Sequence, residues 1–121
     1  MAKHPVVKKS RITIDVGLDR QNMPVEMNWT ASDSPTGNKP QQAKAMLLSL
    51  FDVKTKETLK IDLWTREMQV IEMDRMFYQT LRGLAETYYQ ATQNKKLANQ
   101  MQQFVFYFGQ VTGAIPKEDE S

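Results

Sequence analysis

The chain has 121 residues, a formal net charge of +2 and a sequence pI of about 8.9, so its charge balance alone does not indicate a nucleic-acid or membrane-surface protein. Hydrophobic residues make up 40% and charged residues 25%, which is the composition of an ordinary globular domain. Cysteine is absent, which excludes disulfides, thiol catalysis and cysteine-ligated metals and fits a reducing compartment.

The two ends of the chain differ in charge. Residues 1–9 include three lysines and predict a flexible basic arm, whereas residues 116–121 carry three carboxylates and predict an acidic tail. Residues 10–115 are sufficient for a single domain with its own core. The arm lacks the apolar segment of a signal peptide, and no apolar run reaches the roughly 18 residues of a membrane span, so we expect a cytoplasmic protein.

The first half of the domain has the pattern of a hairpin. Apolar and polar residues alternate over residues 11–18 and again over residues 25–30, which predicts two strands with one buried face each. Between them, residues 19–24 have turn composition, so the two strands should pair. The following stretch, residues 31–42, is rich in Ser, Pro, Gly and Asn and predicts a mobile connecting loop.

The next stretch, residues 43–52, fits two interpretations. Its apolar residues fit one face of a helix, whereas as a strand it would be apolar on both faces. We predict a strand, because residues 53–57 then close a hairpin onto residues 58–64, which alternate as a strand does. A short helical start at residues 40–45 is the alternative.

After residue 69 the hydrophobic period changes to that of a helix. A main apolar stripe and a second stripe beside it give this first helix an arc wide enough to touch both a sheet and a neighbouring helix. The main stripe is Val70, Met73, Phe77, Leu81, Leu84 and Tyr88, and the second is Ile71, Tyr78, Ala85 and Tyr89.

A second helix should begin after Asn94, which is a good N-cap residue, and end near Gly113 and Pro116. Its apolar residues have heptad spacing and predict the seam between the helices: Leu97, Met101, Phe104, Phe108, Val111 and Ile115. We therefore predict an α+β fold, in which a four-stranded antiparallel sheet of two consecutive hairpins is followed by a two-helix antiparallel hairpin packed on one sheet face.

Residue patterns that carry chemistry are scarce, and we expect no enzyme activity, catalytic residue, metal site or cofactor. The single histidine, His4, lies in the basic arm, and the five glycines are scattered rather than gathered in a phosphate-binding loop. Four carboxylates lie close in sequence and could in principle form an acid–base pair. We expect structural roles for them instead, on the outer face of a strand, in the connecting segment or in the first turns of a helix. The four carboxylates are Asp62, Glu67, Glu72 and Asp74.

Nucleic-acid binding is a further alternative, because the chain holds sixteen lysines and arginines. Fourteen acidic residues intersperse with them, and no known nucleic-acid-binding motif is recognisable. We expect at most weak, salt-sensitive binding through the basic arm and no specific nucleic-acid partner.

Apolar residues that the predicted core does not use indicate a protein-binding or self-association surface. Residues 43–52 keep apolar side chains on whichever face is outward, and Trp64 is out of phase with the buried residues of its strand. Met-rich and aromatic surfaces are typical of adaptable protein contacts. The predicted partner-binding residues are Trp64, Met46, Leu48, Leu50, Phe106 and Met68.

Two runs carry a family resemblance, Ala43-Lys44-Ala45-Met46-Leu47-Leu48-Ser49 and Thr58-Leu59-Lys60-Ile61-Asp62-Leu63-Trp64-Thr65. With Met68 and the helix residues that follow, they resemble the gliding motility-associated protein GldC family over roughly residues 10–113. The helix residues are Met73, Phe77, Thr80, Leu81, Ala85, Glu86, Thr87, Ala91 and Thr92. The resemblance does not extend to the two tails and is poor over residues 31–42.

The resemblance implies a bacterial, cytoplasmic accessory protein of gliding motility that contacts a motility-machinery or envelope-associated protein, without a catalytic motif or cofactor. The alternative function is a small-ligand-binding domain or a carboxylate-based enzyme with a cleft between sheet and helices. The pattern is also compatible with a homodimer through the outer sheet face or through an edge strand.

Overall fold

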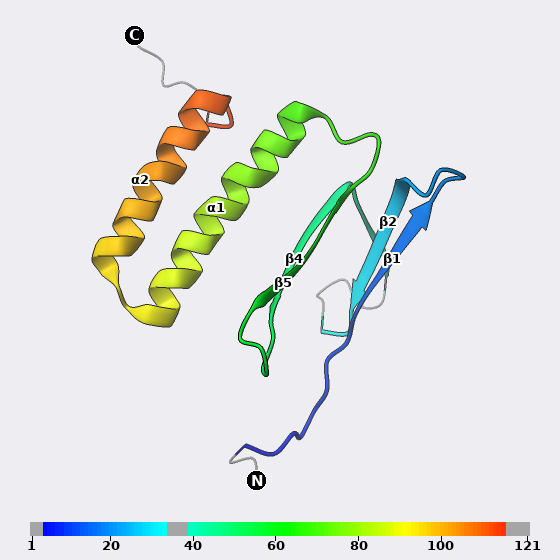
Figure 1. Cartoon of the computed structure of the whole chain (residues 1–121), viewed down its shortest axis with the longest axis horizontal. Helices are drawn as coiled ribbons and strands as arrows, with labels where there is room; N and C mark the ends of the chain where they lie inside the picture. The colour runs from blue at the N-terminus through cyan, green and yellow to red at the C-terminus, as the bar shows by residue number, and fades with distance from the viewer. Residues whose placement is uncertain (1–3, 34–38, 116–121) are drawn as a thin grey trace. The chain divides into compact units, whose positions relative to one another are not determined.

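The computed structural model describes residues 4–33 and 39–115 and divides the chain into two compact units, Met1–Met68 and Gln69–Ser121. The described part of the first unit contains five strands and that of the second contains two helices. Figure 1 labels all of these elements except β3. The predicted acidic tail, the start of the basic arm and residues 34–38 of the predicted loop lie outside the described residues.

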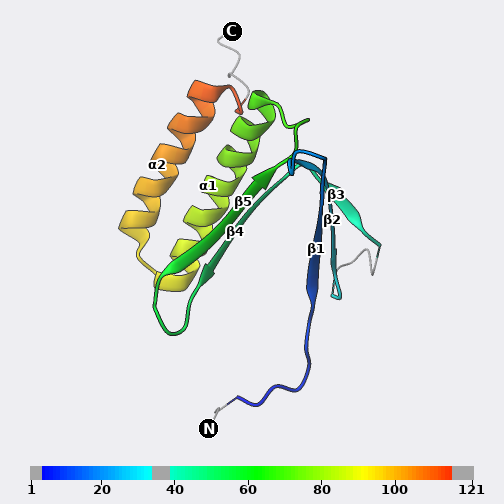
Figure 2. The same ribbon diagram turned by 45° about the vertical axis from the view of Figure 1, so that its right-hand side comes forward.

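Three strands form the first sheet, in the order β1-β2-β3, and Figure 2 labels all three. They are β1 (Ile12–Leu18), β2 (Pro24–Ala31) and β3 (Gln41–Ala43), all antiparallel. The predicted hairpin between the first two strands is confirmed. The register places Ile14 opposite Trp29 and Val16 opposite Met27, so the apolar residues share one face, and Met27 is only 2% exposed.

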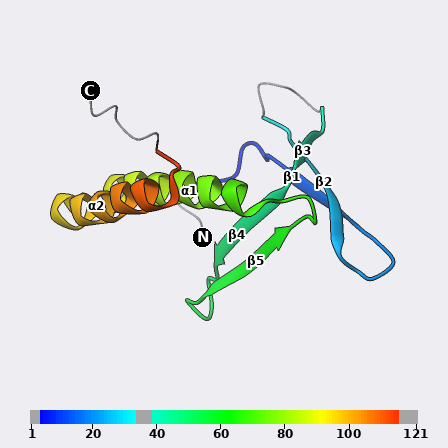
Figure 3. The same cartoon turned by 90° about the horizontal axis from the view of Figure 1, so that it is seen from above.

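Two further strands, β4 (Ala45–Phe51) and β5 (Thr58–Trp64), form a separate antiparallel hairpin (Figure 3). The strand interpretation of residues 43–52 is therefore confirmed for Ala45–Phe51, whereas the single four-stranded sheet was wrong. The reason lies in β3, whose first two residues were predicted as the end of the loop and whose third, Ala43, was predicted as the start of the next strand. This strand runs beside β2 and occupies its free edge, and the chain bends at Lys44 before β4 begins, so β4 pairs only with β5.

The two helices, α1 (Val70–Thr92) and α2 (Lys95–Thr112), lie antiparallel and side by side in Figures 1 and 2. The predicted cap of α2 is confirmed, because the Asn94 side chain accepts a hydrogen bond from the Leu97 N–H at 3.1 Å. The predicted end is also confirmed, with Gly113 in the left-handed conformation at φ 79°. No helix in the described ranges is long and apolar enough to cross a membrane.

Small side chains form the contact between the helices. The buried residues are Ala85 on α1, and Ala98, Val105 and Gly109 on α2. The seam predicted for α2 was wrong, since three of its six residues are exposed: Leu97, Phe104 and Val111. Each exposed residue precedes a buried or half-buried one by a single position, so the true contact is rotated by about 100° around the helix.

Gly109 gives the clearest reason for this rotation. A Cβ atom at this position would lie 2.5 Å from Ile115 Cγ1 and 2.7 Å from Tyr78 Cε1. A side chain larger than hydrogen therefore does not fit at this position without a shift of Tyr78 and Ile115. The heptad pattern counted only large apolar residues and could not detect a contact built on small ones.

The predicted packing of the helices on a sheet face involves both units. It stays a prediction here, as does the single domain over residues 10–115.

We predict opposite effects of two alanine substitutions in the helices. Gly109→Ala should lower the free energy of unfolding by about 1–3 kcal/mol, because the added methyl group overlaps Tyr78 and Ile115. Gly83→Ala is the matched control, since a Cβ atom there meets nothing within 4 Å, and it should raise the stability by about 0.5–1 kcal/mol. Urea unfolding followed by circular dichroism measures both, and a stabilised Gly109→Ala would contradict the close contact.

Candidate functional site

The β4–β5 hairpin has one fully apolar face. In the observed register Met46 lies opposite Leu63, Leu48 opposite Ile61 and Leu50 opposite Leu59. Directly opposed residues in an antiparallel pair point to the same side, so these three pairs form a continuous surface of six apolar side chains, which we call the aliphatic face. Met46, Leu48 and Leu63 are half-buried, and the other three are exposed.

The other face of the hairpin is mixed. There Ala45 lies opposite Trp64, Leu47 opposite Asp62 and Ser49 opposite Lys60. The amino group of Lys60 and the carboxylate of Asp62 form an ion pair at 3.2 Å along the same strand. Trp64 is 56% exposed and Phe51, at the far end of this face, is exposed as well. We call this side the Trp64 face.

The register thus separates the predicted partner-binding residues. Trp64 was predicted to share an outer surface with Met46, Leu48 and Leu50, and this was wrong, because those three lie on the aliphatic face. The reason for the error is that side chains alternate between the two faces of a strand. A shift of the pairing by one residue therefore moves every side chain to the opposite face. As the loop Asp52 to Glu57 joins the strands, position 51 pairs with position 58 and sets all the other pairs.

The remaining two predicted contact residues lie apart from both faces. Met68 is half-buried in the segment after β5, where its N–H donates to the Thr65 carbonyl oxygen at 3.0 Å. Phe106 lies on α2 and is 56% exposed, as the helical pattern predicted. Its exposure is less distinctive than expected, because the neighbouring Tyr107 and the residue Phe104 are equally open to solvent.

The helix pair carries an apolar face that the sequence did not identify as exposed. On both helices the exposed stripe precedes the buried contact by one residue, as Leu84 precedes Ala85 and Phe104 precedes Val105. In an antiparallel pair the second helix runs in the opposite direction and also presents its contact side in the opposite direction. These two reversals cancel, so a stripe that precedes the contact by one residue lies on the same side of the pair in both helices. The face therefore combines residues of both helices: Val70, Phe77, Leu84, Leu97, Phe104 and Val111.

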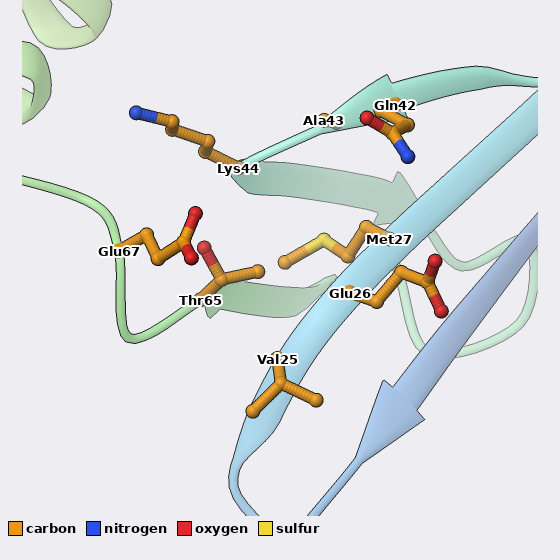
Figure 4. Close-up of a pocket in the computed structure, with 8 residues that line it drawn as sticks. All are labelled: Val25, Glu26, Met27, Gln42, Ala43, Lys44, Thr65 and Glu67. Atoms are coloured by element: carbon orange, nitrogen blue, oxygen red, sulfur yellow. The ribbon is translucent and has the colours of Figure 1, made fainter.

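A hollow of about 470 Å³ in the first unit is lined by Val25, Glu26, Met27, Gln42, Ala43, Lys44, Thr65 and Glu67. Thr65 is the only buried polar residue in the described ranges, and its N–H donates to the Lys44 carbonyl oxygen at 2.8 Å. Figure 4 shows Met27 pointing toward Thr65, whereas Glu26 points away from it. The volume suits a small ligand, and the lining mixes apolar side chains with one lysine and two carboxylates.

Arg66 holds the first hairpin against the segment that follows β5. Its guanidinium group lies 3.3 Å from the Asp19 carboxylate and donates to Gln21 Oε1 at 2.5 Å. Its N–H also donates to the Pro24 carbonyl oxygen at 3.3 Å. The hollow is therefore bounded by backbone segments that are joined at two positions, Lys44 to Thr65 and Pro24 to Arg66.

The Asp19 carboxylate organises the turn between β1 and β2. It accepts hydrogen bonds from the Met23 N–H at 3.1 Å and the Gln21 N–H at 2.8 Å. These bonds, with the charge of Arg66, hold the pKa of Asp19 below its ordinary value. Asp52 does the same in the β4–β5 loop, where hydrogen bonds from Thr55 and Lys54 lower its pKa.

The four carboxylates considered in the sequence do not form one cluster. Asp62 is paired with Lys60, Glu72 accepts from the Gln69 N–H at 3.0 Å at the start of α1, and Glu67 borders the hollow. Asp74 lies half-buried on α1. Within residues 4–33 and 39–115 no three His, Asp or Glu side chains lie close enough together to hold a metal ion. The predicted cleft between sheet and helices involves both units and stays a prediction.

Comparison with known families identifies the chain. The family model described as gliding motility-associated protein GldC-like matches residues 24–113, which is more than half of the 121 residues. The chain belongs to the GldC-like family. No curated protein and no solved structure matches it.

The family match covers β2 to α2 and includes both runs on which the resemblance was based. It leaves out β1, which the resemblance had included. The run from Thr58 to Thr65 forms β5 together with the buried threonine that follows it. In this GldC-like chain the most distinctive stretch of sequence is therefore an exposed strand that ends at the hollow.

We predict that Asp19 contributes stability that depends on pH. A carboxyl group whose pKa is lower in the folded state stabilises the fold above its unfolded pKa of about 3.9, and this contribution is lost as the pH falls through the folded value. Asp19→Asn should therefore be less stable than wild type near pH 7, and the difference should shrink toward pH 3. Urea unfolding between these pH values measures it.

Asp15→Asn is the matched control, because it removes one carboxylate from the polar face of β1, outside the turn and its hydrogen bonds. A difference between Asp19→Asn and wild type that stays constant over the whole pH range would contradict the assigned role of the Asp19 charge.

Proposed function

We propose that this GldC-like protein is a non-enzymatic accessory protein of bacterial gliding motility. It works in the cytoplasm and acts through protein contacts with a motility-machinery or envelope-associated protein. Membership of the gliding motility-associated family supports the cellular process. The contact mechanism is supported above all by the β4–β5 hairpin, which carries apolar side chains on both of its faces.

The two faces differ in what they can bind. The aliphatic face has no polar group among its six side chains, so it suits permanent packing against another apolar layer. The Trp64 face combines a large aromatic side chain with Leu47 and with the charged pair Lys60 and Asp62. An exposed aromatic beside polar groups is the composition of a protein contact that forms and dissociates, and we place the partner there.

A role without catalysis fits the chemistry of the described residues. The hydrogen-bonded carboxylates Asp19 and Asp52 stabilise turns, and both have lowered rather than raised pKa values. A general acid at neutral pH needs the opposite shift. The hollow beside Thr65 is the place where a small ligand would fit, and binding there is compatible with an accessory role.

The experiment is purification of the tagged protein from a gliding bacterium that carries it as the only copy. Wild type should retain a motility or envelope protein, and Trp64→Ala should lose it, because truncating a central aromatic contact costs about 2 kcal/mol or more, or roughly 30-fold in affinity. Gliding on agar, measured as colony spreading, should fall in the same variant.

Val53→Ala is the control, since this residue is apolar and even more exposed than Trp64 but lies in the loop between β4 and β5, and it should behave as wild type. Phe106→Ala tests the helical unit separately. If Trp64→Ala and Val53→Ala both retain the partner, the Trp64 face is not the contact. If wild type retains no motility or envelope protein, the proposed contact mechanism fails.

A further inference from the structure

The β5 strand has one unpaired edge. In the described part of the chain β5 pairs with β4 on one side only, and no backbone group of another segment reaches its other side. The strand is also the more exposed of the two, with Leu59 and Ile61 more than half exposed, whereas the first four residues of β4 are half-buried. A two-stranded hairpin is marginally stable alone and gains stability from a further strand.

The hydrogen-bond pattern shows which residues of β5 face this edge. The Asp52 N–H donates to the Glu57 carbonyl at 2.9 Å, and the Thr65 N–H donates to the Lys44 carbonyl at 2.8 Å. Hydrogen-bonded pairs alternate along an antiparallel ladder, so Leu59, Ile61 and Leu63 also direct their backbone groups to β4. The N–H and C=O groups directed to the open edge are those of Thr58, Lys60, Asp62 and Trp64.

We propose that two copies of the chain associate by antiparallel pairing of β5 with β5. The two-fold axis lies midway between the Ile61 residues of the two copies. The hydrogen-bonded pairs are then Lys60 with Asp62 and Thr58 with Trp64 of the second copy, each occurring twice around the axis. Ile61 faces the Ile61 of the second copy in a non-hydrogen-bonded pair, as the directions of its backbone groups require. The result is one four-stranded sheet in the order β4-β5-β5-β4.

Charge complementarity selects this register. Centring the pairing on residue 61 places a lysine opposite an aspartate twice, and each charge keeps its neighbour on its own strand. Centring it on residue 60 or on residue 62 would place two lysines or two aspartates opposite each other. Centring it on residue 59 or on residue 63 would remove the opposed charges and leave part of the strand unpaired.

The apolar pattern agrees with the same register. Leu59 lies opposite Leu63 of the second copy, and the axis is perpendicular to the sheet, so the aliphatic faces of both hairpins lie on one side. The combined face has twelve apolar side chains in one plane. Pairing through β4 would also keep the faces together, but it offers no opposed charges, because Leu47 would lie opposite Ser49. The β5 pairing does not depend on the motility partner proposed above.

The first test uses charge reversal in the full chain. Lys60→Glu creates two carboxylate pairs across the axis, and Asp62→Lys creates two lysine pairs, so each should weaken dimer formation about tenfold or more. A mixture of these two variants restores an attractive pair at both positions and should form heterodimers. The double variant Lys60→Glu with Asp62→Lys should dimerise as wild type does. Sedimentation equilibrium measures all of them against the monomer mass of 14.0 kDa.

The second test uses the absence of cysteine from the sequence. Ile61→Cys places two thiols in a non-hydrogen-bonded pair, with Cα atoms about 4.5 Å apart, which suits a disulfide. Leu59→Cys is the matched control, because this residue lies on the same strand and face and is also more than half exposed. Its two copies lie four residues apart along the sheet, about 14 Å, and cannot bond.

The expected results are a disulfide dimer of Ile61→Cys on a non-reducing gel, none for Leu59→Cys alone, and a dimer when Leu59→Cys is mixed with Leu63→Cys. A monomeric wild type at all concentrations would overturn the proposal. A dimer that survives both charge reversals, or equal cross-linking of Ile61→Cys and Leu59→Cys, would also overturn it, since either result would place the contact elsewhere or show random collision. Circular dichroism of each variant confirms that it is folded.

Discussion

The register between β4 and β5 is the constraint on which the most informative surfaces of this protein depend. Because the loop of residues 52–57 pairs position 51 with position 58, every later pair follows from it. One face becomes wholly aliphatic, and the other combines Trp64 with charged residues. Burying an aliphatic side chain fully contributes about 1.5–3 kcal/mol. A register shift of one residue would therefore remove most of the stabilisation that burial of the aliphatic face can supply.

The sequence predicted the types of nearly all the main elements but not how the strands are partitioned. Alternation identified β1, β2 and β5, and the hairpin argument resolved residues 43–52 correctly as a strand. The three-residue strand Gln41–Ala43 was missed, because it is shorter than one clear period and adjoins a stretch of turn-forming residues. Its pairing with β2 separates the two sheets, and no local signal in residues 41–43 predicts that pairing.

For the candidate site, the sequence indicated that Trp64 and Phe106 are exposed, but it did not show which of the predicted contact residues share a face. Trp64 and Phe106 are exposed as expected, but Trp64 does not share a face with Met46, Leu48 and Leu50. Counting the pairs outward from the loop would have revealed this. The helix contact was a different kind of error, because its buried residues include Gly109, a residue that hydrophobic patterns ignore. The bonds of Arg66 to the first turn join residues far apart in sequence and have no signature in it.

These bonds of Arg66 have a consequence for the order of folding. The guanidinium group reaches a turn that precedes it by 45 residues, so the contact closes a long loop and carries a correspondingly large entropic cost. During synthesis the β1–β2 hairpin emerges first and depends on its own short-range hydrogen bonds until residue 66 has left the ribosome. We therefore expect the contacts of Arg66 to form late, and a contact that forms late slows unfolding more than it speeds folding.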